Sequence, residues 1–326
     1  MAKNYNLSRD YQFDIDASAY TSYAGKLALP YVTAAVKSPD TIAKKYVRVI
    51  DGLNKSGVIT NLGVTDPIQA ASNCSFQPGS NTSLTEQVVT LTDMKVNEEV
   101  CRGTIFPTWI GENMDRNGNL PQTFQDFLLA SVAAKAASHI ENIIWKGSAD
   151  PALVGFQSND GSLDETGADA SAMKDFHEVD LSGAITSANV IGFLEDVLDK
   201  AIASTHILNA AGFGFYMNRK TYSLYQQALA SATTFQALGA AANFDNLTFM
   251  GYPIYVCPGM FNDTIVATYP ENLVVGTNLL TDYTEATTIP TYQYDGSDNV
   301  RIVMRFAMGV QTAVKDDGVY ATSVWS

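Results

Sequence analysis

The sequence contains few charged residues. Asp, Glu, Lys and Arg make up 17% of its 326 residues, whereas they make up about a quarter of an average soluble domain. A surface with so little charge is covered by neutral polar groups or by other subunits, because the centres of protein interfaces are depleted in charged side chains. Two classes therefore stay open: a neutral secreted or surface protein, and a subunit of a larger assembly.

Positive charge is scarcer than negative charge. The chain has 20 Lys and Arg against 34 Asp and Glu, which gives a formal net charge of -14. This balance argues against a protein that grips nucleic acid, since such a protein needs a basic face to displace counterions from phosphates. It does not argue against a shell around DNA, because an acidic wall repels the enclosed polymer rather than binding it.

Cysteine and histidine are rare and scattered. The cysteines form neither a disulfide framework nor a metal-binding spacing, so we expect reduced thiols that are buried rather than reactive. The histidines share no spacing with each other or with a cysteine that fits a zinc site. These six residues are Cys74, Cys101, Cys257, His139, His177 and His206.

Motifs of catalysis and of cofactor binding are also missing. The chain has no phosphate-binding glycine loop, no Gly-x-Ser-x-Gly elbow and no His-Glu-x-x-His. We therefore expect a protein that is not an enzyme and that has no catalytic, cofactor-binding or metal-binding residues. An enzyme whose site assembles only in the folded chain stays open as an alternative.

Targeting segments are absent as well. The first residues, Met1–Tyr5, lack the apolar core of a signal peptide. No apolar run is long enough to span a bilayer. We expect a protein that is made and kept in the cytoplasm and does not associate with a membrane.

The first third of the chain predicts an arm followed by a ribbon. Residues 1–34 show little periodicity and indicate an extended arm, and Ser38 and Pro39 are expected to cap and open a short helix. Residues 52–105 are punctuated by glycine and proline and predict a long β-hairpin with strands at 58–62 and 86–91. Because an isolated ribbon is marginal in water, it needs a surface to lie on, and a neighbouring subunit is the natural candidate.

Residues 121–146 give the clearest helix. Apolar residues recur every three or four positions from Phe124 to Ile144, and alanines between them favour a helix. Pro121 fits the first turn, and Gly147 fits the end. At ~1.5 Å per residue such a helix is nearly 40 Å long.

The last third predicts an ordered array of strands. A strand at 213–217 runs into a helix at about 219–229, and strands follow at 250–256, 272–276 and 291–294. A turn at 295–299 leads into a closing strand at 300–310. Arg301 and Arg305 lie four residues apart on this strand and so share one face. They form either a solvated face or ion pairs between subunits, which the geometry of arginine favours.

Three segments of this array resemble motifs of a known family. Tyr216–Tyr222 resembles the motif "M-N-x-x-t-y", Met250–Ile254 resembles "G-x-P-v", and Val300–Ala307 resembles "v-x-x-R-x-g". In this order, with the hairpin and the long helix before them, they resemble a major capsid protein of tailed phages with the Hong Kong 97-type fold. The resemblance covers nearly the whole chain.

The resemblance implies an α+β fold with an N-terminal arm, an extended β-hairpin called the E-loop, a peripheral domain with a long spine helix, and an axial α/β domain. The arm and short helix would then be residues 1–51, and the E-loop 52–105. The peripheral domain would be residues 106–180 and 299–326, with its spine helix at 121–146. The axial domain would be residues 181–298.

The resemblance also implies a structural function. Copies of the chain would form hexamers and pentamers of an icosahedral head around double-stranded DNA, held without sequence-specific contacts. The protein would be located in the virion and assembled in the host bacterial cytoplasm. Only about fifty residues precede the hairpin, so we expect a separate scaffold protein, together with a portal and possible decoration proteins. No lysine lies between Lys55 and Lys95, so cross-linking through the hairpin is not expected.

The residues that we expect at contacts between subunits lie in the hairpin and in the closing strand. They are Pro78, Asn81, Glu86, Arg301 and Arg305. Alternatives to a phage capsid are an encapsulin-like compartment shell, which has the same fold, and a β-rich surface or adhesion protein, which the Thr, Asn and Ser content favours.

Overall fold

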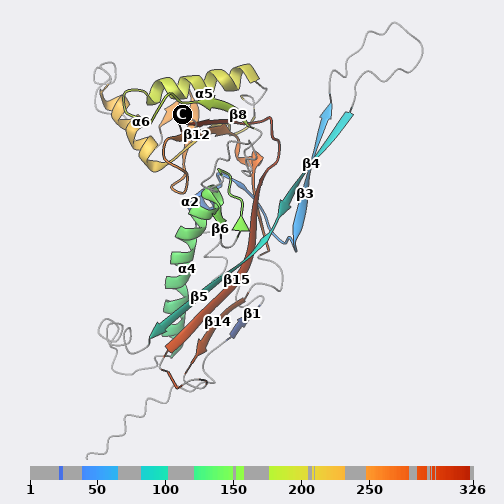
Figure 1. Cartoon of the computed structure of the whole chain (residues 1–326), viewed down its shortest axis with the longest axis vertical. Helices are drawn as coiled ribbons and strands as arrows, with labels where there is room; N and C mark the ends of the chain where they lie inside the picture. Colours follow the sequence, from blue (N-terminus) through green and yellow to red (C-terminus); the bar gives the residue numbers. More distant parts are fainter. Residues whose placement is uncertain are drawn as a thin grey trace, which may run out of the picture.

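The computed structural model consists of two lobes joined end to end, with a long ribbon that projects to one side of them (Figure 1). The structure describes residues 22–24, 39–64, 82–101, 121–149, 152–157, 176–204, 208, 210–231, 247–278, 285–291, 294, 296–297 and 299–323.

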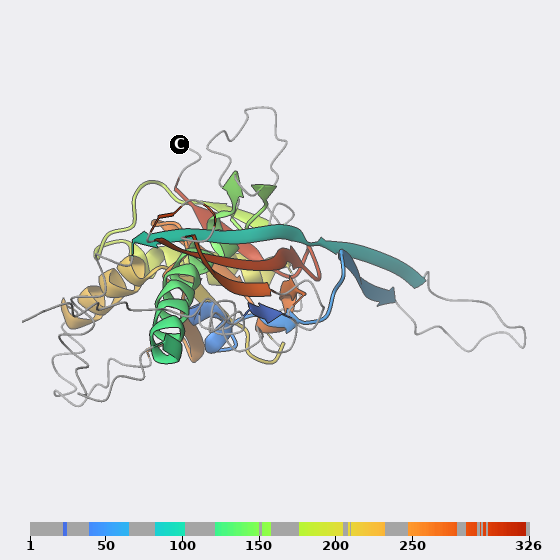
Figure 2. The same ribbon diagram turned by 90° about the horizontal axis from the view of Figure 1, so that it is seen from below.

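The first lobe is a six-stranded sheet with the long helix α4 (Pro121–Lys146) packed on one face, as Figure 2 shows from below. Its central strand β15 (Asn299–Thr312) pairs antiparallel with three other strands. The remaining strands of this sheet are β1 (Ser22–Ala24), β2 (Arg48–Ile50), β5 (Thr92–Cys101), β13 (Leu273–Thr277) and β14 (Glu285–Pro290).

Local sequence signals set both ends of α4. Pro121 is its first residue, where a missing N–H is tolerated. Gly147 follows the last residue with a φ of 73° and donates its N–H to the carbonyl of Ile143 over 2.8 Å. This left-handed conformation favours glycine and closes the helix. The helix predicted at 121–146 is confirmed at both ends.

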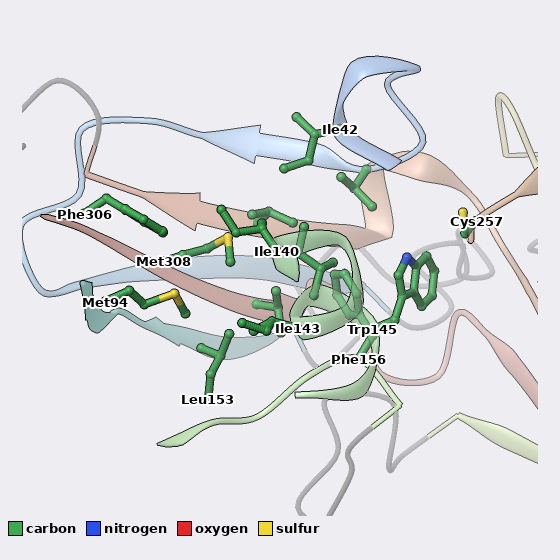
Figure 3. Close-up of a cluster of buried hydrophobic side chains, with 14 of the residues drawn as sticks. Ile42, Met94, Ile140, Ile143, Trp145, Leu153, Phe156, Cys257, Phe306 and Met308 are labelled. Atoms are coloured by element: carbon green, nitrogen blue, oxygen red, sulfur yellow. The ribbon is translucent and has the colours of Figure 1, made fainter. Parts of the chain in front are cut away.

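The core of the first lobe lies between α4 and one face of β15. From Val300 to Phe306 every second residue of β15 is buried, because successive side chains of a strand point to opposite faces, and residues 306–310 are all buried. Arg301 and Arg305 are exposed on the other face, as their spacing predicted. The core, part of which is drawn in Figure 3, includes Met94, Ile140, Ile143, Trp145, Ile302, Met304, Phe306 and Met308.

The second lobe is another six-stranded sheet, covered by the helices α5 (Val190–Ser204) and α6 (Arg219–Ser231). The strand β9 (Gly214–Met217) runs directly into α6, as the sequence predicted. The other strands are β8 (His177–Asp180), β10 (Thr248–Phe249), β11 (Tyr252–Val256), β12 (Thr264–Thr268) and β16 (Val319–Thr322).

The ribbon is a two-stranded hairpin of β3 (Ser56–Val64) and β4 (Thr82–Thr90). Leu91 then separates two ladders, because β4 pairs with β3 up to Thr90 and β5 pairs with β15 from Thr92. One nearly continuous strand therefore begins in the hairpin and ends in the first sheet. Of the range 52–105, residues 92–101 pair with β15 rather than with β3.

Other predicted boundaries also differ from the observed elements. The helix near Ser38 is a single turn, α2 (Asp40–Ala43), with Pro39 at its N-cap, and Arg48–Ile50 continues as strand β2. The strand predicted at 291–294 lies instead at Glu285–Pro290. The side-chain hydroxyl of Thr291 donates to the carbonyl of Asn299 over 2.9 Å, so this residue closes the turn before β15.

The two sheets divide the chain differently from the predicted domain ranges. β13 and β14 lie in the sheet of β15, although residues 181–298 were assigned to the axial domain. β8 and β16 lie in the second sheet, although both ranges were assigned to the peripheral domain. The cause is strand pairing over long sequence separations, such as β13 with β2, which periodicity does not reveal. The small elements are β6 (Ser148–Ala149), β7 (Ala152–Leu153) and the 3-10 helix η4 (Pro270–Asn272).

Candidate assembly interface

One face of the hairpin carries large apolar side chains in contact with water. In the antiparallel register Val58 lies opposite Val88, and Leu62 lies opposite Leu84. Their exposed fractions are 58%, 47%, 62% and 61% in that order. On each strand the two residues lie four positions apart, and they stand opposite each other across the strands, so all four share one face. We call them the hairpin stripe.

Glu86 lies at the centre of the hairpin stripe. It is exposed and stands opposite Thr60, between the two apolar pairs. The hairpin stripe is therefore apolar at both ends with one carboxylate in the middle. Pro78 and Asn81, the other contact residues predicted in the hairpin, lie outside the described residues.

The outer face of the first sheet carries the predicted arginines. The Arg301 guanidinium forms an ion pair with Glu99 on β5, with 2.8 Å between Nε and Oε2. Asn299 donates to the same carboxylate over 2.6 Å. Arg305 lies opposite Lys95 in the register of β15 and β5. Glu86, Arg301 and Arg305 are thus not brought together within one chain, because the first belongs to the hairpin and the others to the sheet.

A buried polar cluster joins α2 to the end of α4 near the second lobe. The backbone N–H of Thr41 donates to Glu141 over 3.0 Å, and its hydroxyl donates to the other oxygen of the same carboxylate. The indole N–H of Trp145 donates to the Thr41 hydroxyl over 2.9 Å. Since Thr41 and Trp145 are fully buried, these bonds fix α2 against α4 and indicate a structural role.

The second lobe touches this cluster through Cys257 and Gly259. Burial raises the pKa of the Cys257 thiol well above its usual value, although a hydrogen bond with Thr41 lowers it. The thiol therefore stays protonated at neutral pH. A side chain at Gly259 would collide with the backbone carbonyl of Glu141, so the turn after β11 lies directly on α4.

A second polar clamp holds the turn between β15 and β16. The side chain of Asn272, which is fully buried, donates to the carbonyl of Asp317 over 2.9 Å and accepts from the N–H of Val314 over 2.7 Å. The hydroxyl of Tyr269 donates to the Asp317 carboxylate over 2.9 Å. The pKa of Tyr269 is raised, mainly by burial and secondly by this hydrogen bond. The closing strand therefore ties the two lobes together.

The remaining singled-out residues that the structure describes are not gathered into one site. Cys257 is buried as predicted, but Cys101 is exposed, because the side chain of this last residue of β5 points away from the core, so the prediction of a buried thiol is wrong there. His139 is exposed on α4, and His177 lies in β8. Cys74 and His206 lie outside the described residues.

The described part of the chain shows neither clustered metal ligands nor a helix that could span a membrane. No group of three His, Cys, Asp or Glu side chains there is arranged to hold a metal ion. No helix in those residues is both long and apolar enough to cross a bilayer.

Two structurally important residues were missed by sequence reasoning. Glu141 follows Ala137 by four positions on the apolar side of α4, so an acidic residue on that stripe was a usable signal for a buried partner. Asn272 carried no comparable signal, because Asp317 and Val314 lie more than forty positions later and, of its side-chain partners, only Thr268 is local.

Solved structures of capsids resemble this chain over most of its length. A chain of the satellite phage P4 procapsid, a structure that includes the size determination protein, has a TM-score of 0.56 at 12% identity, with 90% of this chain and 98% of that chain covered. A chain of the native GTA particle capsid has a TM-score of 0.56 at 13% identity, with 98% and 99% covered. A chain of Gordonia phage Cozz has a TM-score of 0.56 at 13% identity, with 87% and 86% covered.

Sequence comparison adds nothing to these structural matches. No protein-family model matches the chain, and no curated protein matches it. The expected α+β class is confirmed by the two lobes, each of which combines a sheet with helices. The chain has the fold of the major capsid proteins of tailed phages.

Proposed function

We propose that this chain is the major capsid protein of a tailed phage, and that its copies form the hexamers and pentamers of an icosahedral head around double-stranded DNA. The hairpin stripe is the observation that carries this proposal. A capsid fold is combined with a projecting ribbon whose apolar face has no cover within the described residues of its own chain.

Burial of the hairpin stripe against a neighbouring copy would be favourable in free energy. Full burial of one Val or Leu side chain contributes about 1.5–3 kcal/mol, so covering the exposed halves of four contributes roughly 3–7 kcal/mol per hairpin. An isolated two-stranded ribbon is marginal in water. A contact repeated around a ring of subunits would stabilise the hairpin and the ring together.

In this proposal the hairpin is the E-loop, α4 is the spine helix, and the first and second lobes are the peripheral and axial domains. Pro78, Asn81 and Glu86 of one copy contact a neighbour. Arg301 and Arg305, which lie on the outer face of the first sheet together with Glu99, contact a second copy.

Further partners follow from the same proposal. A separate scaffold protein directs assembly in the host cytoplasm, a portal occupies one vertex, and decoration proteins can bind the outer surface of the virion. DNA is enclosed without sequence-specific contacts, in keeping with the net charge of -14. The chain itself acts as a wall and not as an enzyme.

The other predicted functions have less support. The structural matches do not favour an encapsulin-like compartment. The structural matches are capsids, and they give no support to a surface or adhesion protein. An enzyme would need a site, and the described residues bring together polar clusters whose contacts are structural.

Size-exclusion chromatography and negative-stain imaging of the expressed chain test the proposal. We expect rings, sheets or shells from the wild-type chain, and monomers from a Leu62→Lys, Leu84→Lys variant, because each lysine places a charge in the hairpin stripe. Thr85→Lys is the matched control, since Thr85 is exposed on the opposite face of the same strand. A wild-type chain that stays monomeric at its highest soluble concentration, also with scaffold protein present, would falsify the proposal.

A further inference from the structure

Residues 299–323, which we call the closing segment, supply an interior strand to each lobe. In the first sheet β15 pairs with β5, β13 and β14, and within the described residues these three strands do not pair with one another (Figure 1). In the second sheet β16 lies between β12 and β8. Without the closing segment the described strands of the first sheet are two separate pairs and a lone β5, and β8 loses its only described neighbour.

The closing segment also completes both hydrophobic cores. Val319 and Ala321 of β16 are fully buried in the second core. The face of β15 toward α4 contributes to the first core Ile302, Met304, Phe306 and Met308. Because lone strands and two-stranded pairs are marginal in water, the strands of the first lobe have no stable sheet to join until β15 is present.

Buried polar groups between β12 and β13 depend on the same segment. The fully buried side chain of Asn272 accepts from the N–H of Val314 over 2.7 Å and donates to the carbonyl of Asp317 over 2.9 Å. The hydroxyl of Thr268 donates to the same carbonyl over 2.7 Å. Without residues 314–317 these buried groups lose hydrogen bonds, which is unfavourable. The turn between β12 and β13 therefore reaches its final environment only when the closing segment is in place.

The hairpin has no seat in the first lobe without β15. Val89, at the base of the hairpin, is fully buried, and a Cβ at Gly276 would lie 2.8 Å from its Cγ1. The carbonyl of Thr90 lies so close to Gly309 of β15 that a side chain there would collide with it. The chain then pairs with β15 through β5. The direction in which the hairpin leaves the lobe is therefore set only after β15 has been added.

We propose that the closing segment delays closure of the lobes until it has been synthesised, so that a chain without it cannot assemble. The hairpin ends at Thr90, and β15 begins at Asn299, about two hundred residues later. At ~5–20 residues per second this separation takes roughly 10–40 s to synthesise, whereas a hairpin forms in about 1–10 μs. The consequence for assembly rests on the proposed function: an unfinished copy cannot present the hairpin stripe in the orientation that neighbours require.

Pulse labelling of native thiols on ribosome-bound chains tests the delayed closure. Cys257 is fully buried between the lobes, whereas Cys101 is exposed, and Cys74→Ser removes the third thiol. The chain is stalled behind a Gly/Ser linker. The linker is either long enough to place residues 299–323 outside the ribosome or so short that they stay in the exit tunnel. A maleimide that shifts gel mobility then counts the reactive thiols.

We expect two labels with the short linker and one with the long linker, because Cys257 is covered only after β15 joins the sheet. Cys101 is labelled in both cases and controls for access. With the long linker, Ile302→Asp should keep two labels, since a carboxylate in the core prevents β15 from packing. Arg305→Asp, the same change on the exposed face of β15, should give one label. Replacement of residues 58–88 by a Gly/Ser linker should also give one label.

Two outcomes overturn the delayed closure. One label with the short linker would mean that the lobes close without β15. Two labels on the wild-type sequence with the long linker would mean that the closing segment is present and does not close them.

Co-expression of a chain that ends at residue 298 with the wild type tests the consequence for assembly. We expect the short chain to be missing from shells purified by sedimentation. Shells that contain it would contradict this consequence and leave the proposed function intact. If the wild type forms no shells under any condition, the proposed function fails, and the labelling result still decides the delayed closure.

Discussion

The lobes bury most of their large apolar side chains, whereas the hairpin exposes four of its own. Every residue of β12 and β13 is buried inside a lobe, whereas the hairpin stripe places four large apolar side chains in water. The lobes complete their cores within one chain, and the hairpin needs a second surface to complete its own. Under the proposed function, stability of the subunit and assembly of subunits depend on different residues and can be changed separately.

Removal of the hairpin should give the largest effect. Residues 58–88 can be replaced by a two- or three-residue Gly/Ser linker, because Gly57 and Val89 are opposite in the register and their Cα atoms are only about 5 Å apart. We expect complete loss of rings and shells by negative-stain imaging, with circular dichroism and thermal unfolding of the lobes unchanged. Val89 and Leu91 must stay, since they cover Gly276.

Two outcomes of the same deletion would contradict the contrast between the hairpin and the lobes. If the shortened chain still forms shells, the hairpin is not an assembly element. If the lobes unfold, the hairpin is part of their core and the contrast between the two regions is wrong. A chain in which residues 58–88 are kept but Leu62→Lys and Leu84→Lys are introduced tests the same contrast without changing the length.

Sequence reasoning succeeded where the determining contacts are local. Helix α4 could be predicted to the residue, because Pro121, the apolar spacing and Gly147 are signals within one segment. The alternation of Arg301 and Arg305 with buried neighbours was predictable for the same reason. Both strands of the hairpin could be located from their β-prone runs.

It failed where the outcome depends on distant partners. The switch of one strand from β3 to β15 at Leu91 is set by pairing with residues some two hundred positions later. Thr291 looks like a strand residue, but its backbone N–H and its hydroxyl both donate to the carbonyl of Asn299, over 3.0 and 2.9 Å, at the turn between β14 and β15. The ion pair of Arg301 with Glu99 could not be predicted from the sequence for the same reason.

A substitution in the polar cluster should weaken the lobes without touching the hairpin. Thr41→Val removes the hydroxyl that accepts from Trp145 and donates to Glu141. We expect a loss of about 1–3 kcal/mol, because buried polar groups are left without their bond. Urea unfolding followed by tryptophan fluorescence measures it. Thr60→Val, in the exposed hairpin, should change stability by less than about 0.5 kcal/mol, and an equal loss in both variants would contradict the comparison.

Alkaline pH should also act on the lobes. Burial raises the pKa of Cys257 above its usual value near 9.0, so the unfolded chain loses this proton first. The stabilising contribution is complete below about pH 9 and declines as pH rises further, by at most ~1.4 kcal/mol per pH unit for one proton. Between about pH 8 and pH 10, the free energy of unfolding of Cys257→Ala should fall less steeply with pH than that of the wild type. Cys101→Ser, at an exposed thiol, should follow the wild-type curve; if Cys257→Ala follows it too, the thiol is not the cause.

The smallest effect on the subunit is expected at the ion pair between Arg301 and Glu99. Both side chains are about half exposed, at 51% and 43%, and exposed pairs contribute at most about 1 kcal/mol. Arg301→Ala should therefore leave unfolding nearly unchanged, and Glu99→Ala should match it if the pair acts only within the chain. If Arg301 also contacts a neighbour, Arg301→Ala alone reduces assembly, most strongly at low salt, where charge pairs are least screened. If Arg301→Ala and Glu99→Ala assemble equally at every salt concentration, Arg301 makes contacts only within its own chain.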